Sequence, residues 1–316
     1  MTTKIFIDGA AGTTGLEIRE RLAGRAELRL VALDDARRKD PKARADALND
    51  ADVVILCLPD DAAREAVSLI ANPNVRVLDP SSAHRTAASW TFGFPELESS
   101  RRLELRSSKR VSNPGCYSSG FIALARPLVR AGLVPADWAF TCNAVSGYSG
   151  GGRAMIAEFE DEKAPNYSRE VFRTYALSLE HKHVEEMRMH SGLAHRPLFA
   201  PSVGRFYRGM LVEIPLQLAA IPGSPSVAAI HAVLSNSYRG EKLIEVASLS
   251  DAAAMKALDA EELKNTNKLK IYVFGNEAKK QARLVAALDN LGKGAAGACV
   301  QNLNVMMGWP ETEGLA

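Results

Sequence analysis

The sequence lacks the features that mark several broad classes of protein. Its 316 residues contain no apolar run long enough to span a bilayer, and an expected strand begins at Lys4, which leaves no room for a signal peptide. The 37 acidic and 39 basic residues give a formal net charge of +2, without a basic stripe for nucleic acid or a basic membrane anchor. We therefore expect a cytoplasmic protein whose partners are small molecules, not nucleic acid or a membrane.

Cysteine is also scarce. The four cysteines lie far apart and match no metal-ligand spacing, so we expect no metal site and no disulfide framework. The composition, 47% hydrophobic and 24% charged, is that of a globular protein, and the length suits about two domains. The cysteines are Cys57, Cys116, Cys142 and Cys299.

A glycine-rich turn follows the first expected strand. Residues 4–8 are apolar and lead into the pattern GxxGxxG, after which residues 16–22 have helical periodicity. Strand, glycine turn and helix place backbone N–H groups and a helix dipole against a pyrophosphate. A tight turn without a ligand is the alternative. The residues expected to hold a dinucleotide are Gly9, Gly12, Thr13, Thr14 and Gly15.

Charged residues after the second expected strand, residues 28–33, bear on which dinucleotide binds. The acids at 34–35 would hold a ribose 2′-hydroxyl, whereas Arg37, Arg38 and Lys39 would accommodate a 2′-phosphate. Three consecutive cations favour NADP, with Arg37 and Arg38 as ligands. A solvated basic turn is the alternative.

The order of expected elements predicts the fold class. Strands alternate with helices in the first third, which is typical of an α/β, doubly wound parallel sheet. Longer strands in the second half predict an α+β domain with a broad sheet suited to dimer contact. The further strands are expected at 52–58, 75–79, 138–145, 208–218 (broken by Pro215), 269–274 and 282–288, and helices at 41–49 and 62–71.

One cysteine stands out by its surroundings. Cys116 follows an Asn-Pro-Gly turn and precedes an apolar segment, residues 121–133, that is typical of a helix. A thiol at a helix N-terminus lies at the positive end of the helix dipole, which favours the nucleophilic thiolate. The alternative is a small buried hydrophobic residue. The glycine turn and the histidines further along favour the nucleophile.

A second glycine-rich loop begins at Ser146. In one interpretation its N–H groups and hydroxyls, with Ser146 and Gly147 among them, bind an oxyanion or phosphate. In the other, Ser149 is the nucleophile of a GxSxG elbow, and an acid and a histidine follow it in the order a serine hydrolase requires. The extra glycine and the cysteine turn make the hydrolase the weaker interpretation.

Two histidines, His181 and His183, precede a pair of acids. On a helix His183 and Glu186 would share one face, as would His181 and Glu185. A carboxylate that orients an imidazole serves general acid–base catalysis. A solvated helix start is the alternative.

The loop after the fourth expected strand contains His84 and Arg85. It lies at the carboxyl end of that strand, where ligands collect in open α/β sheets. Arg85 would clamp an anionic substrate group there, and an ordinary surface arginine is the alternative. His84 has no assigned role.

Several of these motifs can be taken together: the first glycine turn, the turn that ends at Cys116, the loop that begins at Ser146 and the two histidines with Glu186. Three further segments belong with them, residues 92–97 (FGFPEL), 293–297 (KGAAG) and 301–302 (QN). In their order along the chain they closely resemble the N-acetyl-γ-glutamyl-phosphate reductase family, in its short-form branch, within the aspartate-semialdehyde dehydrogenase superfamily. The chain departs from the family pattern in two places. Residues 118–119 are Ser-Ser where many relatives have Pro-Thr, and the loop at 80–85 only partly matches the usual Ser-Ala-Asp-Phe-Arg.

The resemblance implies an enzyme of arginine biosynthesis that reduces an acyl phosphate to a semialdehyde and phosphate with NADPH. The Cys116 thiolate would form a thioester, and His183 or His181 would transfer protons, with His183 favoured because Glu186 is three residues on. It implies a nucleotide domain of residues 1–115 with 290–316, a catalytic and dimerisation domain of residues 116–289, and a homodimer or homotetramer. A reductase of aspartyl phosphate or another acyl phosphate is the alternative. The implied substrate-binding residues are Arg85, Ser146, Gly147 and Glu186, and Asn302 would lie close to the nicotinamide.

Overall fold

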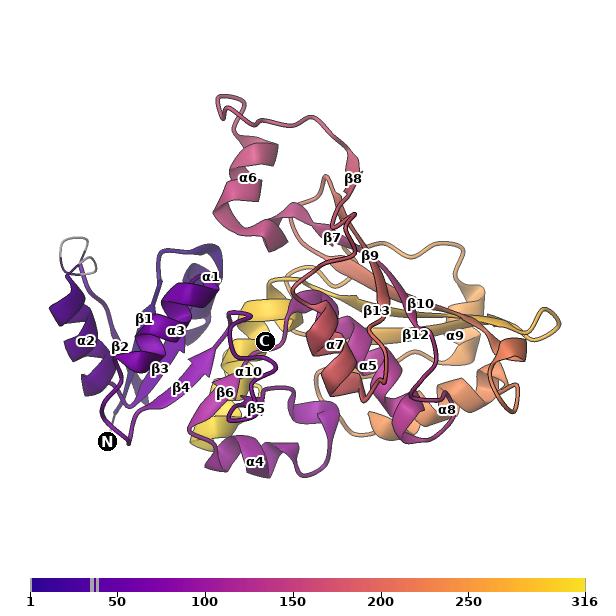
Figure 1. Cartoon of the computed structure of the whole chain (residues 1–316), viewed down its shortest axis with the longest axis horizontal. Helices are drawn as coiled ribbons and strands as arrows, with labels where there is room; N and C mark the ends of the chain where they lie inside the picture. The colour runs from indigo at the N-terminus through magenta and orange to yellow at the C-terminus, as the bar shows by residue number, and fades with distance from the viewer. Residues whose placement is uncertain (1, 35–36, 38–39, 316) are drawn as a thin grey trace. The chain divides into compact units, whose positions relative to one another are not determined.

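The chain is described by a computed structural model that covers residues 2–34, 37 and 40–315. The chain divides into two compact units. Unit 1 comprises Met1–Pro114 and Ala295–Ala316, and unit 2 comprises Gly115–Gly294. Each unit has its own sheet, and most of the strands are labelled in Figure 1. Across the described ranges, no helix is both long and apolar enough to cross a membrane.

Unit 1 is built on a six-stranded sheet in the order β2-β1-β3-β4-β6-β5, in which every neighbouring pair is parallel. This confirms the predicted doubly wound α/β architecture. The strands are β1 (Thr3–Asp8), β2 (Leu28–Val31), β3 (Val53–Leu56), β4 (Arg76–Asp79), β5 (Thr91–Phe92) and β6 (Arg110–Ser112). The helices are α1 (Thr13–Leu22), α2 (Pro41–Asp50), α3 (Asp60–Ser68), α4 (Arg101–Ser107) and α10 (Gly297–Met307).

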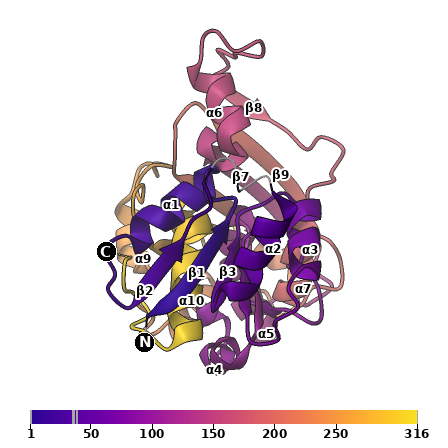
Figure 2. The same cartoon turned by 90° about the vertical axis from the view of Figure 1, so that its left-hand side faces the viewer.

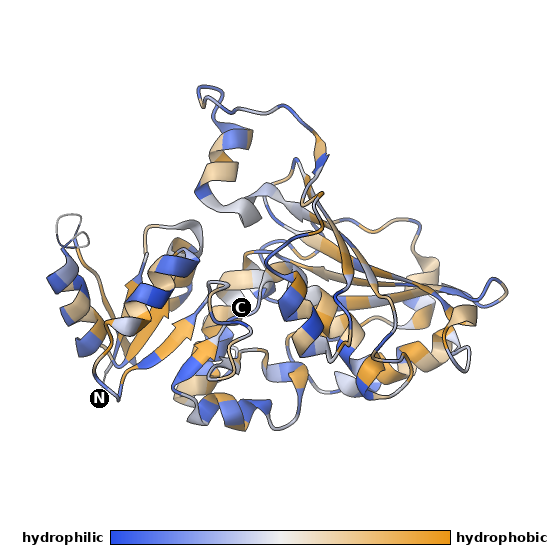
Figure 3. Cartoon of the chain, in the orientation of Figure 1, coloured by the Kyte–Doolittle hydropathy of each residue, from blue (hydrophilic) through white to orange (hydrophobic). Residues whose placement is uncertain are grey.

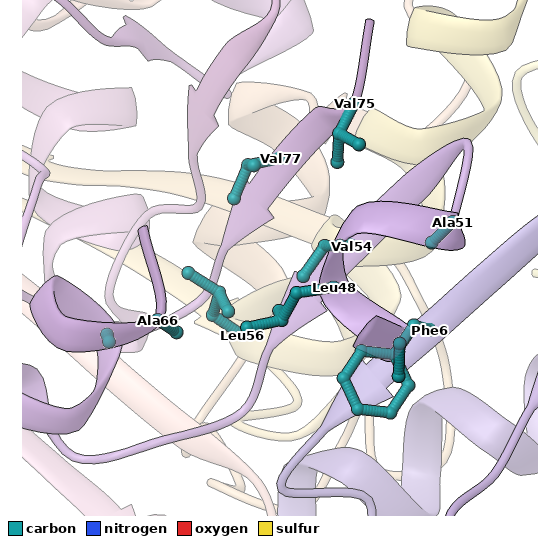
Figure 4. Packing of buried hydrophobic residues seen from close by; sticks show 10 residues of the cluster. Phe6, Leu48, Ala51, Val54, Leu56, Ala66, Val75 and Val77 are labelled. Carbon is teal, nitrogen blue, oxygen red and sulfur yellow. The ribbon is translucent and has the colours of Figure 1, made fainter. Parts of the chain in front are cut away.

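Helices cover the sheet of unit 1 because its strands are apolar on both faces, as parallel strands are when both faces are buried. One face carries Phe6, Val54 and Val77, which pack against Leu48 of α2 and Ala66 of α3 (Figure 4). α2 and α3 lie side by side in Figure 2. α1 packs against α10, and α10 also contacts β4. The hydrophobic colouring of this sheet contrasts with the hydrophilic residues on α1 and α2 (Figure 3).

Unit 2 is built on a mixed seven-stranded sheet in the order β11-β12-β13-β10-β7-β9-β8. α5 contacts β10 and β13, and α8 contacts β12, so these two helices cover the sheet. The strands are β7 (Thr141–Gly147), β8 (Phe172–Thr174), β9 (Leu198–Gly204), β10 (Met210–Gln217), β11 (Ile244–Val246), β12 (Leu269–Asn276) and β13 (Gln281–Leu288). The helices are α5 (Cys116–Arg130), α6 (Gly152–Glu160), α7 (Val184–Ser191), α8 (Val227–Ser237) and α9 (Leu249–Ala254).

Pro215 does not break β10, contrary to the sequence expectation. β10 pairs with β13 along its whole length, and Pro215 is opposite Arg283. On its other side β10 pairs with β7 only from Met210 to Glu213. Pro215 therefore lies where β10 has one neighbour, and a proline without an N–H is tolerated on such a free edge.

Candidate active site

Cys116 is the first residue of α5. Gly115 is the N-cap in extended conformation, and the helix continues for 15 residues. The expected position of Cys116 at a helix N-terminus is confirmed, although the helix begins five residues before the apolar segment 121–133, because the Pro-Gly turn ends immediately before the cysteine. The half-buried Cys116 lies in the first helical turn, where unpaired backbone N–H groups and the helix dipole favour the thiolate.

An acidic residue of α7 forms a hydrogen bond with the turn before Cys116. The backbone N–H of Gly115 donates a hydrogen bond of 2.8 Å to Oε1 of Glu186, which is 1% exposed. Glu186 lies in the first turn of α7, which begins one residue after His183. The carboxylate thus links the start of α5 to the histidine segment.

His181 and His183 are brought together beside α5. Their ring centroids lie 4.7 Å apart at an angle of 82°, and both lie within about 6 Å of the Tyr117 ring. The backbone N–H of His183 donates to Nδ1 of His181 at 3.1 Å. The expected pairing of His181 with Glu185 is wrong, because His181 precedes the helix and Glu185 accepts hydrogen bonds from Arg188.

Two tyrosines extend the cluster, and neither was predicted from the sequence as a site residue. The Tyr175 hydroxyl donates to the Tyr117 hydroxyl at 3.1 Å, and the Tyr117 hydroxyl donates to the Ser202 carbonyl oxygen at 3.2 Å. Burial raises the pKa of Tyr175 to about 12, and the negative charge of the Cys116 thiolate acts in the same direction. Tyr117 directly follows the cysteine and offered a signal, whereas Tyr175 lies 58 residues further on.

The second glycine-rich loop lies at the end of β7. Ser146 is buried, and its hydroxyl donates to the Gly147 carbonyl oxygen at 3.1 Å. A side chain at Gly147 would meet the Tyr207 carbonyl oxygen at 2.6 Å, so the backbone approach requires glycine. Both residues belong to unit 2, as do Cys116 and the two histidines.

Ser149 lacks the surroundings of a hydrolase nucleophile. It is 1% exposed and lies in a 3₁₀ turn, where its hydroxyl accepts a hydrogen bond of 2.9 Å from Nδ2 of Asn290. A serine nucleophile needs an exposed hydroxyl beside an imidazole. The amide partner and the burial give Ser149 a structural position, and the serine hydrolase interpretation loses its support.

The first glycine turn, in unit 1, is tightly packed at Gly9 and Gly15 but not at Gly12. Gly9 has a φ of +85°, and a side chain on Gly15 would meet the Gly9 carbonyl oxygen at 2.7 Å. A Cβ at Gly12, the N-cap of α1, would meet only that carbonyl oxygen, at 3.4 Å. The turn therefore has no space for a side chain at Gly9 or Gly15, whereas there is space beside Gly12, immediately before α1 begins with Thr13 and Thr14.

The cationic segment after β2 is only partly described. Arg37 is exposed, and its backbone N–H donates to Oδ1 of Asp34 at 2.8 Å. Arg38 and Lys39 lie outside the described residues.

Asn302 of α10 is fully buried in unit 1. Its Nδ2 donates to the Gly93 carbonyl oxygen at 2.7 Å and to Oδ1 of Asn113 at 2.8 Å. Its Oδ1 is buried and makes no hydrogen bond with the part of the chain that the structure describes. Asn302 therefore braces the turn before Cys116 and retains one buried acceptor.

Arg85 is 8% exposed and is not an ordinary surface arginine. Its Nε donates to the Asn113 carbonyl oxygen at 2.9 Å, and its Nη2 donates to the Pro80 carbonyl oxygen at 2.8 Å. The neighbouring His84 places Nδ1 2.6 Å from Oδ2 of the fully buried Asp79 and stacks on Trp90. This loop thus supports the same turn from the side of β4.

The other cysteines differ from Cys116. Burial raises the pKa of the thiols of Cys57, Cys142 and Cys299, so each stays protonated at neutral pH. Among residues 2–34, 37 and 40–315, no three His, Cys, Asp or Glu side chains form a group that would hold a metal ion.

Comparison with known proteins matches both units to semialdehyde dehydrogenases, and similar proteins align over almost the whole chain. Residues 116–290 match the family described as semialdehyde dehydrogenase, dimerisation domain, and residues 37–104 match the semialdehyde dehydrogenase, NAD binding domain. The N-acetyl-gamma-glutamyl-phosphate reductases of Brucella ovis and Brucella canis are each 51% identical over 309 residues, which are 98% of this chain and 100% of the relative.

Solved structures of aspartate semialdehyde dehydrogenases share the fold. The enzyme II of Vibrio cholerae complexed with ASA has a TM-score of 0.72 at 14% identity, with 97% of this chain and 98% of that chain covered. The Candida albicans enzyme with NADP has a TM-score of 0.67 at 15% identity, with the same two shares covered. At this identity the likeness concerns the fold alone.

Proposed function

The chain belongs to the N-acetyl-gamma-glutamyl-phosphate reductase family of semialdehyde dehydrogenases, and from this membership we propose its reaction. The enzyme reduces N-acetyl-γ-glutamyl phosphate to N-acetylglutamate 5-semialdehyde and phosphate with NADPH, a step of arginine biosynthesis. The 51% identity over 98% of the chain carries the proposal. The half-buried cysteine at the start of α5, beside two histidines, supplies the chemistry.

Cys116 is the nucleophile in this proposal. Its thiolate attacks the acyl carbon, the bond to the phosphate oxygen breaks, and phosphate leaves behind a thioester on Sγ. NADPH, when bound, supplies the hydride that reduces the thioester carbonyl. The resulting thiohemiacetal then collapses to the aldehyde and restores the thiol. The helix dipole stabilises the thiolate at both ends of this cycle.

The hydrogen bond between the histidines supports His183 as the acid–base group. Nδ1 of His181 accepts the backbone N–H of His183, so the ring proton of a neutral His181 is on Nε2. Protonation of Nδ1 would break that bond. His181 is therefore a fixed hydrogen-bond donor suited to hold a substrate oxygen, and His183 takes up and returns the proton.

The substrate-binding residues are proposed on two different grounds. Ser146 and Gly147 lie at the end of β7 in the same unit as Cys116, which suits them to contact the substrate. Arg85 and Glu186 are engaged with the Asn113-to-Gly115 turn through hydrogen bonds. We assign them to holding the turn that presents Cys116, and Arg85 would add its positive charge to the attraction of an anionic substrate.

NADP is the proposed cofactor, within the coarser NAD-binding assignment of residues 37–104. The open position at Gly12, ahead of Thr13 and Thr14, would admit the pyrophosphate. The nicotinamide carboxamide has an N–H₂ group, and it would donate a hydrogen bond to the buried Oδ1 of Asn302, which accepts none within the described chain. Arg37, with Arg38, would bind the 2′-phosphate.

A homodimer or homotetramer is proposed through unit 2, whose match is to a dimerisation domain. A depression of about 650 Å³ on its sheet is lined by Trp138, Pro215, Phe274 and Arg283, among others. Along β10, the side chains of Pro215 and Gln217, which line the depression, are exposed, whereas Ile214 and Leu216 are buried. A second copy would cover this face.

A substrate comparison tests the reaction. In the reverse direction the enzyme is given phosphate, NADP⁺ and either N-acetylglutamate 5-semialdehyde or aspartate 4-semialdehyde. We expect kcat/KM for the N-acetylated substrate to exceed the other by at least about 10²-fold, because a site built for the acetamide leaves polar groups unpaired with aspartate semialdehyde. Preference for aspartate semialdehyde would assign the chain to the alternative reaction.

A further inference from the structure

A π-helical turn connects β13 to α10. It spans Gly292–Ala296, and such turns are rare and occur frequently at functional sites. The buried carboxylate of Asp289 holds its beginning: Oδ1 accepts the backbone N–H groups of Leu291 and Gly292 at 2.8 and 3.1 Å. Oδ2 of the same carboxylate lies 2.9 Å from Nε of Arg208. The start of the turn is thus fixed by a fully buried, charge-paired anchor.

Gly294, in the middle of this turn, lies directly against the cysteine. A Cβ on Gly294 would stand 2.8 Å from Cβ of Cys116 and 3.0 Å from the Asp289 carbonyl oxygen. The Gly294 N–H donates to that same oxygen at 2.9 Å, so the residue cannot move away without losing a hydrogen bond. Atoms this close leave no space for any side chain.

The backbone conformation does not explain the glycine. The φ of Gly294 is outside the left-handed region, so an L-residue would fit the backbone there without strain. What excludes every other residue is the contact with Cys116 and the turn itself. The glycine is therefore required by the close approach to the cysteine.

We propose that Gly294, held by the Asp289 anchor, is a positioning residue for the nucleophile. The Gly294 backbone forms a wall beside Cβ of Cys116 and restricts the staggered orientations that Sγ can take. Sγ is thereby directed away from the turn before substrate arrives, which lowers the entropy lost on reaching the attack geometry. This inference rests on the proposed function of Cys116.

The test is Gly294→Ala, with kcat, KM, the iodoacetamide alkylation rate of Cys116 and NADPH binding measured on the same preparation. We expect kcat to fall by about 10²-fold, the order of loss that a misplaced reacting atom produces. The alkylation rate of Cys116 should change, while the Kd for NADPH and the KM for substrate change little. A merely structural glycine would lower the melting temperature without moving the alkylation rate of the folded protein.

Gly275→Ala is the matched control. It is also in unit 2, in β12, and a Cβ there would meet Cγ2 of Val227 at 2.2 Å. This substitution should lower thermal stability while leaving kcat and Cys116 alkylation near those of the unsubstituted enzyme. The control distinguishes the loss of stability caused by a Cβ in a crowded position from a specific effect on the reactivity of Cys116.

Asp289→Asn provides a second variant, because an amide cannot accept hydrogen bonds at both of its terminal atoms. We expect it to loosen the turn and to change Cys116 alkylation in the same direction as Gly294→Ala. Unchanged kcat and alkylation in both variants, with Cys116→Ser inactive, would overturn the positioning role alone. An active Cys116→Ser enzyme would overturn the proposed function itself.

Discussion

Gly115 and Glu186 are joined by a hydrogen bond of 2.8 Å between residues 71 positions apart. The N–H belongs to the N-cap of the helix that starts with Cys116, and the carboxylate lies in the first turn of the helix that follows His183. One buried bond therefore sets the nucleophile and the histidine segment relative to each other. Both ends lie in unit 2.

Removing this acceptor should impair turnover more than substrate binding. Glu186→Ala leaves the Gly115 N–H unpaired, which costs about 1–3 kcal/mol, and it frees the turn that presents Cys116. We expect kcat to fall by about 10²-fold with a small change in KM, and Glu186→Gln to retain much more activity because its amide oxygen still accepts.

The neighbouring Glu185 offers the control for that experiment. It pairs with Arg188 on the surface, and such pairs contribute about 0–1 kcal/mol. Glu185→Gln should leave steady-state kinetics unchanged. A rise in KM without loss of kcat in Glu186→Ala would instead make Glu186 a substrate ligand.

Cys116 should be the fastest-reacting thiol of the chain. Burial raises the pKa of Cys57, Cys142 and Cys299, and a raised pKa keeps a thiol protonated and unreactive as pH rises toward 9. Iodoacetamide followed by peptide mass spectrometry should therefore label Cys116 first, with loss of activity in proportion, and bound substrate should protect it. Equal labelling of all four cysteines, or activity in Cys116→Ala, would exclude the thiol mechanism.

The cationic segment at 37–39 should select NADP over NAD. Charge-assisted hydrogen bonds contribute about 1.5–3 kcal/mol, so replacing Arg37, Arg38 and Lys39 by Ala should raise KM for NADP⁺ by at least about 10-fold and leave KM for NAD⁺ nearly unchanged. Lys42→Ala is the control, because Lys42 is exposed nearby and pairs with Asp46. Equal changes for both coenzymes would reduce the segment to a solvated turn.

Local patterns predicted the parts of the fold that depend on local sequence. Residues adjacent in the sequence are enough to recognise the glycine turn, the alternation of strands and helices and the position of Cys116 after Pro-Gly. The spacing of residues in the sequence does not predict contacts between segments that are far apart in the chain. Glu186 was expected to lie on one helical face with His183; α7 begins only after the histidine, and the same carboxylate also accepts the N–H of Gly115, a contact that spacing did not indicate.

The same limit explains the residues that the sequence did not indicate. Tyr175 reaches Tyr117 from a loop 58 residues away, and no periodicity marks it. Gly294 was visible as part of a glycine-rich segment, but its contact with Cys116 spans most of unit 2. Pro215 was expected to break a strand because the sequence does not reveal where β7 stops pairing with β10.

His183 should carry the proton transfer, and His181 should act as a hydrogen-bond donor to the substrate. General acid–base catalysis contributes about 10²–10⁴-fold, so His183→Asn should lose kcat on that order while still forming the thioester with acyl phosphate. His181→Asn should act mainly through KM, because its amide can still donate a hydrogen bond while Oδ1 accepts the His183 N–H. The measurement is kcat and KM for both variants side by side across pH 6–9. The pH dependence of kcat that reports the acid–base group should vanish in His183→Asn and persist in His181→Asn. Near-normal kcat in both variants would place the proton donor elsewhere, and the reverse pattern would exchange the two roles.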